Sequence, residues 1–269
     1  MRRYEEVYVL LKGKKSILIK KGKKMITSPF DKEVLYKKYK KSFLQQAVVI
    51  LRYKKDDWGC VNKEKWNEYI QNNFFMKAEK FFVDGVVGLS KKDNSIDYLF
   101  SKDQVAIRIQ GKDYVSFSDT IIPHVYKMRK FIKDVVGLNS VDEVEIRKWD
   151  AWQVKPDEKN QALDKEIQRY FLSQDFFNYN TNIDDPKDLA PNEDCVKAFK
   201  WIVGKRELRV NASMLNPKDL LCLILYSDCI TKSGVSVEKI EGELEESNYD
   251  LFRIFDWSIS DNARKLMEE

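Results

Sequence analysis

Hydrophobic and polar residues follow one another in short blocks along this chain, and the period of each block predicts its secondary structure. The first two apolar runs, residues 4–11 and 16–19, are rich in β-branched and aromatic residues and flank Gly13. Such a pattern is typical of a β-hairpin. Residues 1–24 are therefore expected to begin with a hairpin whose turn and following loop are crowded with lysine.

The next block carries the signals of a helix that starts near residue 28. Ser28 is a good N-cap and Pro29 suits the first helical position. Lysines 37, 38, 40 and 41 would then lie in the last turn, where the helix dipole favours cations. The basic N-terminus is thus predicted to consist of a hairpin followed by a helix.

The remaining blocks predict short strands and helices in alternation. Strands are expected at residues 46–53, 81–89, 96–100, 104–110, 141–154, 195–203 and 207–214. Helices are expected at residues 62–79, 118–136, 161–172, 236–255 and 261–269, the fourth of them as one helix or a pair. The apolar run at residues 220–226 is too short for its period to separate strand from helix.

This order of elements predicts an α+β fold, because hairpins outnumber βαβ crossovers. We expect mixed, mostly antiparallel sheets with helices packed on one face. The polar segment 155–160 is the best internal boundary, so residues 1–154 and 161–269 are interpreted as two α+β halves. Each half has hairpin strands followed by a helix, which suggests two similar halves without any residue-level repeat.

Charge is unevenly distributed along the chain. Residues 1–42 hold fourteen Lys and Arg against four acidic residues, whereas residues 232–269 hold five against ten. A basic head and an acidic tail could pair with each other, with a second copy to give a homodimer, or with different partners; both ends could also be ordinary solvated segments.

Cysteine usage and hydropathy indicate the compartment. The four cysteines lack the paired spacing of a zinc site and are too sparse for a disulfide framework, so we expect free thiols. No apolar stretch is long enough for a membrane span, and the N-terminal apolar run is too short for a signal peptide. The protein is expected in the cytoplasm, away from membranes.

Motifs for catalysis are scarce. The glycines are scattered rather than clustered before a helix, which argues against a phosphate-cradling loop. The single histidine, His124, lies in a predicted helix and is interpreted as structural or surface-exposed. We therefore assign no catalytic residue, no metal ligand and no cofactor.

A metal-dependent nuclease stays open as an alternative. Asp157, Glu158 and Lys159 spell part of such a site but fall in the predicted linker. Glu143 and Glu145 are a better pair, because residues two apart on a strand point the same way. No lysine follows them at the required spacing.

Basic residues interleaved with aromatics make nucleic-acid binding a further alternative. The candidate residues are Lys20, Lys21, Lys23, Lys24, Lys37 and Lys40. Arg147, Trp149 and Trp152 form a similar set on one strand, where the tryptophans either stack on bases or fill the core. The nearly balanced total charge, +5, is low for a dedicated nucleic-acid-binding protein.

The C-terminal segment NYDLFRIFDWSISDNARKLMEE resembles the closing segment of an uncharacterised, sporadically distributed family of bacterial proteins of similar length. The matching residues are Phe252, Phe255, Ile259, Ser260, Asp261 and Met267. The segments ILRYKKD near residue 50 and YLFSKDQVAIRIQGKDYVSFSD are also similar, so the resemblance spans residues 45–269 and leaves out the basic N-terminus. It implies genes carried on mobile elements, in a context of phage defence, and no assigned activity.

The poverty of reactive side chains favours a non-catalytic binding or assembly protein that works through its surface. Its expected partner is a protein, including a second copy of itself. Nucleic acid, bound through the basic N-terminus, is the other partner that the sequence suggests.

Overall fold

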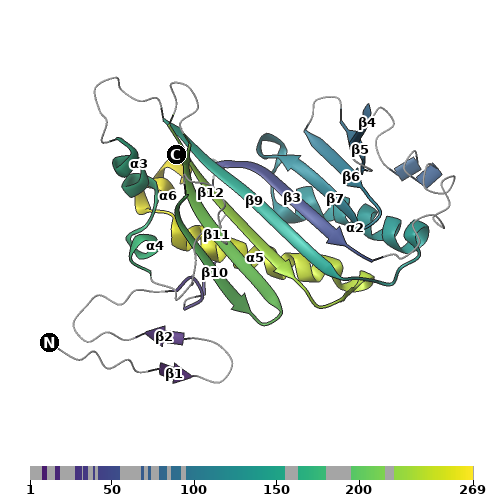
Figure 1. Cartoon of the computed structure of the whole chain (residues 1–269). Helices are drawn as coiled ribbons and strands as arrows, with labels where there is room; N and C mark the ends of the chain where they lie inside the picture. Colours follow the sequence, from purple (N-terminus) through teal and green to yellow (C-terminus); the bar gives the residue numbers. More distant parts are fainter. Residues whose placement is uncertain are drawn as a thin grey trace.

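The computed structural model describes residues 8–10, 16–18, 28–31, 33–35, 39, 42–54, 68–69, 72–73, 79–83, 86–91, 95–154, 163–179, 195–215 and 221–268. Within them, nine strands form one large antiparallel sheet, and helices pack against one of its faces (Figure 1). This confirms the predicted α+β class.

The large sheet is built from strands of very different length. Its strands are β3 (Leu44–Arg52), β4 (Glu79–Val83), β5 (Val86–Ser90), β6 (Ile96–Phe100), β7 (Gln104–Gln110), β9 (Glu143–Val154), β10 (Cys195–Val203), β11 (Arg206–Leu215) and β12 (Leu221–Thr231). Two small sheets pair β1 (Tyr8–Leu10) with β2 (Ser16–Leu18) and β8 (Ser140–Val141) with β13 (Val235–Ser236). The pairing of β1 with β2 forms the hairpin expected near the N-terminus.

The helices of the described residues follow the strands in chain order. They are α2 (Ile122–Phe131), α3 (Leu163–Phe171), α4 (Gln174–Asn178), α5 (Ile240–Ser258) and α6 (Asp261–Glu268). Helical turns of π type extend α2 at both ends, over Phe117–Ile121 and Ile132–Val136. Gly137 stops this helix in the left-handed conformation, at a φ of 79°.

The strand order of the large sheet is β10-β11-β12-β9-β3-β7-β6-β5-β4. In the N-terminal half, β3 pairs with β7, the last strand of the β4–β7 meander, and α2 follows. In the C-terminal half, β9 pairs with β12, the last strand of the β10–β12 meander, and α5 follows. The two halves thus repeat one topology around the central β3–β9 pair and share a single sheet; their division into two domains stays a prediction.

Alternation along β9 separates the two faces of the sheet. Trp152 points to the helices, where its ring stacks on Phe171 of α3 at 5.3 Å and lies 6.4 Å from Phe255 of α5. Lys148, on the same side, donates to Asn248 of α5 at 2.6 Å. Trp149 and Ala151 point the other way, because successive side chains of a strand alternate. We call the helix-covered side the covered face and the opposite side the open face; Figure 1 shows α2 and α5 behind the sheet and no described helix on the near side.

The covered face carries the hydrophobic core. Val49, Ile107, Ile146 and Leu223 are completely buried there. Beneath β10 an aromatic cluster joins α4 and α5 to the sheet, through Phe176, Tyr179, Phe199, Trp201 and Trp257. Aromatic pairs of this kind add to the free energy gained from burial alone.

Two expectations about elements were wrong. The helix predicted from Ser28 is absent from the described residues 28–31, 33–35, 39 and 42–43, where Ser28 and Asp31 form a turn and the following described residues belong to no helix or strand. Tyr39 and the Val34 carbonyl instead hydrogen-bond along α5. Tertiary contacts with α5 therefore override the local capping signals.

The strand expected at residues 81–89 is two antiparallel strands, β4 and β5. The dipeptide Asp84-Gly85 between them is typical of a two-residue hairpin turn, a signal that outweighs the continuous apolar run. The undecided run at residues 220–226 belongs to β12.

None of the described helices combines the length and the apolar composition that crossing a membrane requires.

Candidate functional site

The open face carries two rows of polar side chains that run across the strands. In the first, which we call the basic row, register places Lys200, Arg209, Asp228, Arg147, Val48, Arg108 and Asp97 next to one another on consecutive strands from β10 to β6. Four of these seven residues are cations. The row exists only in the folded sheet, because each cation comes from a different strand.

The second row lies two residues further along each strand, and we call it the amide–aromatic row. It consists of Asn211, Tyr226, Trp149, Gln46 and Gln110, from β11 to β7. All five side chains are partly exposed. The Trp149 and Tyr226 rings lie 5.0 Å apart and are inclined by 60°. The two rows are therefore parallel bands of different chemistry on one surface.

Carboxylates lie beneath the cations of the basic row. Arg108 donates through Nε and one terminal nitrogen to Asp97. The side chain of Arg108 is 44% exposed, whereas that of Asp97 is 1% exposed. The carboxylate is thus buried against the strands, at what we call the floor of the open face, and it holds the guanidinium group, which faces solvent.

Glu145 has the same role at the centre of the sheet. It accepts from Nε of Arg147 and, at 2.5 Å, from Arg52 on the neighbouring strand β3. Its side chain is 1% exposed, and those of Arg147 and Arg52 are 33% and 32% exposed. Burial alone would lower the pKa of Arg147, but the hydrogen bond and charge of Glu145 outweigh it and raise that pKa.

Glu207 organises the β11 end of the basic row. Arg209 donates to it, Lys200 lies 3.2 Å away and Lys232 donates to it at 3.3 Å. Burial opposes ionisation of this carboxyl, but the hydrogen bonds from the three cations outweigh burial and lower its pKa to about 2. Glu207 is therefore ionised throughout the physiological range.

Asp228 differs from the other carboxylates of the row. Its Oδ2 accepts a hydrogen bond from Tyr226 at 2.9 Å, whereas its buried Oδ1 has no hydrogen-bond partner among the described residues. Arg209 and Arg147 flank it but turn to Glu207 and Glu145 instead. Burial accordingly dominates and raises the pKa of Asp228 to about 6.

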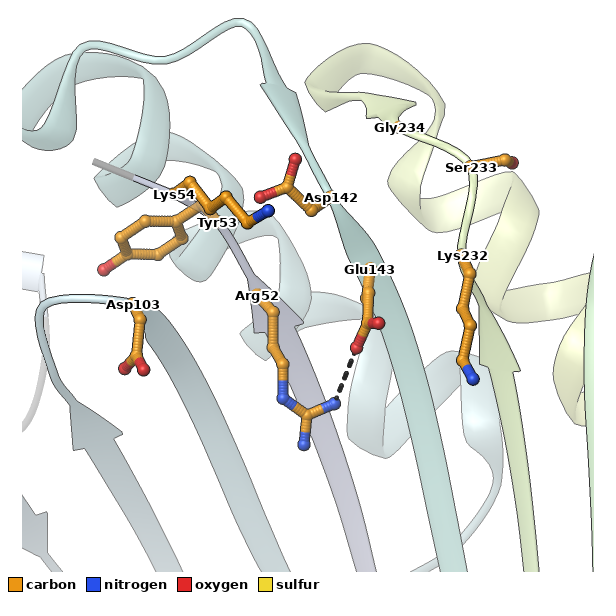
Figure 2. A pocket seen from close by; sticks show the side chains of 9 residues that line it. All are labelled: Arg52, Tyr53, Lys54, Asp103, Asp142, Glu143, Lys232, Ser233 and Gly234. Atoms are coloured by element: carbon orange, nitrogen blue, oxygen red, sulfur yellow. Dashed lines mark hydrogen bonds and ion pairs between the residues drawn. The ribbon is translucent and has the colours of Figure 1, made fainter. Parts of the chain in front are cut away.

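A pocket of about 490 Å³ opens beyond the basic row, where β3 and β12 end and β9 begins (Figure 2). Three cations and three carboxylates line it: Arg52, Lys54, Lys232, Asp103, Asp142 and Glu143. Arg52 donates to Glu143 at 3.2 Å across the pocket wall. Its volume is within the range of small-molecule sites, but its lining is charged rather than apolar, so it continues the open face.

Of the residues that the sequence suggested for a metal-dependent nuclease, the structure describes Glu143 and Glu145. Glu143 and Glu145 do point the same way, as expected, but both accept hydrogen bonds from Arg52. No group of three His, Cys, Asp or Glu side chains suited to a metal ion occurs among the described residues. Asp157, Glu158 and Lys159 are outside them.

His124 is half-buried in α2 and hydrogen-bonds through Nδ1 with the Tyr98 hydroxyl. Burial, together with the nearby charges of Lys127 and Lys91, lowers its pKa to about 4. It is a neutral side chain near pH 7, in contact with residues of the covered face.

The acidic tail pairs largely within the chain. Glu238 and Glu241 bind Arg129, and Arg206 contacts Glu243, Glu246 and Asp250 of α5. These carboxylates are therefore partly neutralised before any partner arrives.

The lysines proposed from the sequence for nucleic-acid binding, Lys20, Lys21, Lys23, Lys24, Lys37 and Lys40, lie outside the described residues. The set on β9 is divided by the fold: Arg147 and Trp149 share the open face, whereas Trp152 is buried on the covered face. Arg108, Arg209, Asp228 and the amide side chains were missed. Charged or amide residues at every second position of β11, namely 207, 209 and 211, were the available signal.

In comparison with known proteins, no family model matches this chain, and no curated protein matches it.

Proposed function

We propose that this protein is a non-catalytic, cytoplasmic binding protein that holds a polyanionic partner on the open face of its sheet. The observation that carries the proposal is the layering of charge. Asp97, Glu145 and Glu207 lie at the floor of the open face, and the guanidinium groups of Arg108, Arg147 and Arg209 lie above them. A partner that approaches this face meets cations first.

The buried carboxylates give these arginines a fixed direction. Arg147 uses only Nε for Glu145, so its two terminal nitrogens have no hydrogen-bond partner among the described residues. An arginine held in place loses little conformational entropy when it binds an anion, and its planar fork matches phosphate, sulfate or carboxylate groups. Preorganised donors in a row are suited to binding an extended anion.

Binding is favoured over metal-dependent cleavage because three carboxylates of the face already have cationic partners. A metal-dependent nuclease would need carboxylates free to ligate an ion. Glu143, Glu145 and Glu207 each accept hydrogen bonds from arginine or lysine, which an ion would have to displace.

The described cysteines support a reducing compartment, since Cys195, Cys222 and Cys229 are free thiols. A setting in phage defence rests on the resemblance of the C-terminal segment. Homodimerisation through a basic head and an acidic tail is the weaker alternative, because many tail carboxylates pair within the chain.

Retention on immobilised heparin, a sulfated polyanion, tests the proposal. Arg147→Gln/Arg209→Gln removes two charges from the open face and leaves Glu145 paired with Arg52 and Glu207 paired with Lys200 and Lys232. The matched control, Lys239→Gln/Lys265→Gln, removes two exposed charges from the covered-face side of the molecule.

The open-face variant is expected to elute at clearly lower salt, with the slope of log affinity against log salt reduced by about 2. The control variant should elute close to the wild type. Equal shifts in both variants, or no shift in either, would contradict the proposal.

A further inference from the structure

We infer that the partner of the open face is single-stranded nucleic acid, with its phosphates on the basic row and its bases on the amide–aromatic row. This inference rests on the function proposed above and adds the chemical class of the partner. It is carried by the juxtaposition of the two rows, whose members alternate on the same strands.

The geometry of the rows matches a strand laid across the sheet. Neighbouring strands lie about 4.8 Å apart, so the basic row extends roughly 24 Å from Lys200 on β10 to Arg108 on β7. The amide–aromatic row lies two residues away along each strand, roughly 7 Å to one side. A nucleotide chain has the same lateral order, because its charged backbone runs along one side and its bases project to the other.

The aromatic pair supplies stacking surfaces at the centre of the site. Trp149 is on β9 and Tyr226 on β12, and both are partly exposed. Each is two residues from a member of the basic row, Arg147 and Asp228 respectively. A base stacked on an aromatic ring beside a phosphate-binding arginine is the common arrangement in proteins that bind single strands.

The amide side chains distinguish this face from a simple polyanion site. The side chains of Gln46, Gln110 and Asn211 are partly exposed and make no hydrogen bond with another described residue. An amide can both donate to and accept from the edge of a base. A sulfated or carboxylated polymer has no bases, so it would contact the cations of the basic row and make no base contact with the amide–aromatic row.

A single strand fits better than a duplex. The bases of a duplex stack on each other, so their faces are not available to Trp149 or Tyr226. A flexible single strand can lay its phosphates along the basic row and turn its bases to the amide–aromatic row at the same time.

The experiment measures fluorescence anisotropy of labelled 20-nucleotide probes: mixed-sequence single-stranded DNA, the same sequence as RNA, its duplex, and an oligonucleotide of equal length whose central bases are replaced by abasic sites. The abasic probe keeps every phosphate and removes the bases. It therefore tests the role of the second row on the wild-type protein, even if a variant folds poorly.

Variants then locate the effect. Trp149→Ala removes the central stacking surface, and Trp149→Phe retains an aromatic ring. Tyr126→Ala is the control, because Tyr126 of α2 is also exposed and has Arg129 and Lys130 at 5.1 Å from its ring centroid, but lies away from the open face. Circular dichroism confirms that each variant is folded.

Wild-type protein is expected to bind the intact single strand about tenfold more tightly than the abasic probe. Trp149→Ala should lose about the same factor for the intact strand and change little for the abasic probe. Trp149→Phe should stay within about twofold of the wild type, and Tyr126→Ala should match it. Binding of DNA and RNA with equal affinity assigns recognition to phosphates and bases; a preference for RNA adds the 2′-hydroxyl.

Two results would overturn the inference and leave the proposed function standing. One is equal affinity for intact and abasic probes with no effect of Trp149→Ala, while Arg147→Gln/Arg209→Gln still weakens both. The other is tighter binding of the duplex than of the single strand. If Arg147→Gln/Arg209→Gln changes neither the affinity for any probe nor the retention on heparin, the proposed function fails as well.

Discussion

Two neighbouring residues of β9, Arg147 and Lys148, show how differently the two faces of one sheet treat a positive charge. Arg147 points to the open face, and its pKa is raised because Glu145 outweighs the cost of burial. Lys148 points to the covered face, where burial between the sheet and α5 lowers its pKa despite the charge of Asp150. At these two positions of β9, therefore, the open face preserves the positive charge and the covered face works against it.

The carboxyl groups repeat the contrast. Burial on the covered face raises the pKa of Asp150, although Lys148 is nearby. Glu207 on the open face has three cationic donors and a pKa lowered to about 2. The difference shows that proximity to one cation does not offset burial at Asp150, whereas hydrogen bonds from three cations do so at Glu207.

The largest effect that sharpens the comparison concerns two tryptophans of β9. Trp152→Ala should lower the free energy of unfolding by about 3–5 kcal/mol, because it leaves a cavity among Phe171, Phe255 and the sheet. Trp149→Ala should cost at most about 1 kcal/mol, because Trp149 is partly exposed and loses chiefly its contact with Tyr226. Urea denaturation of both variants measures the difference. Similar losses would mean that the open face is part of the core.

A smaller effect follows from Asp228, the open-face carboxyl that lacks an arginine donor. Its folded-state pKa of about 6 exceeds the usual value of an aspartate, so the folded protein retains a proton that the unfolded chain releases between about pH 4 and pH 6. The free energy of unfolding of the wild type should therefore fall as pH rises through this window. Relative to Asp228→Asn, which cannot titrate at this position, the fall should be up to about 3 kcal/mol.

Denaturation of the wild type and Asp228→Asn at pH 4, 5 and 6 checks this expectation. Glu207→Gln is a useful comparison, because the depressed pKa of Glu207 gives the opposite sign: its stabilisation is present above about pH 4.5 and is lost as pH falls towards 2. A stability difference between wild type and Asp228→Asn that does not change from pH 4 to pH 6 would show that Asp228 is ionised throughout.

Much of the fold could be predicted from local pattern. Three features could be predicted because each depends on a few neighbouring residues. They are the β1–β2 hairpin, the strict alternation of Val105, Ile107 and Ile109, and the end of the helix at Gly137. The order of elements was enough to predict an α+β class. The failures, at the segment from Ser28 and at residues 81–89, came where a tertiary contact or a second antiparallel strand replaced the longer pattern.

The candidate site was harder to predict, because it is a product of strand register. Arg147 and Trp149 could be recognised as a pair two residues apart on one strand. Arg209, Arg108 and Gln46 come to lie beside them only through the order β11-β12-β9-β3-β7, in which the central β9–β3 pairing joins the two halves. Single-strand alternation predicts that a residue faces outward, but it does not predict its neighbour on the next strand.

Arginine footprinting tests the central claim, that the open face is the binding surface, most directly. A dicarbonyl reagent modifies exposed guanidinium groups, and mass spectrometry then compares each arginine with and without saturating heparin. We predict strong protection of Arg108, Arg147 and Arg209 and none of Arg169, which is exposed on α3. The account would be contradicted if heparin protected Arg169 while Arg108, Arg147 and Arg209 stayed reactive.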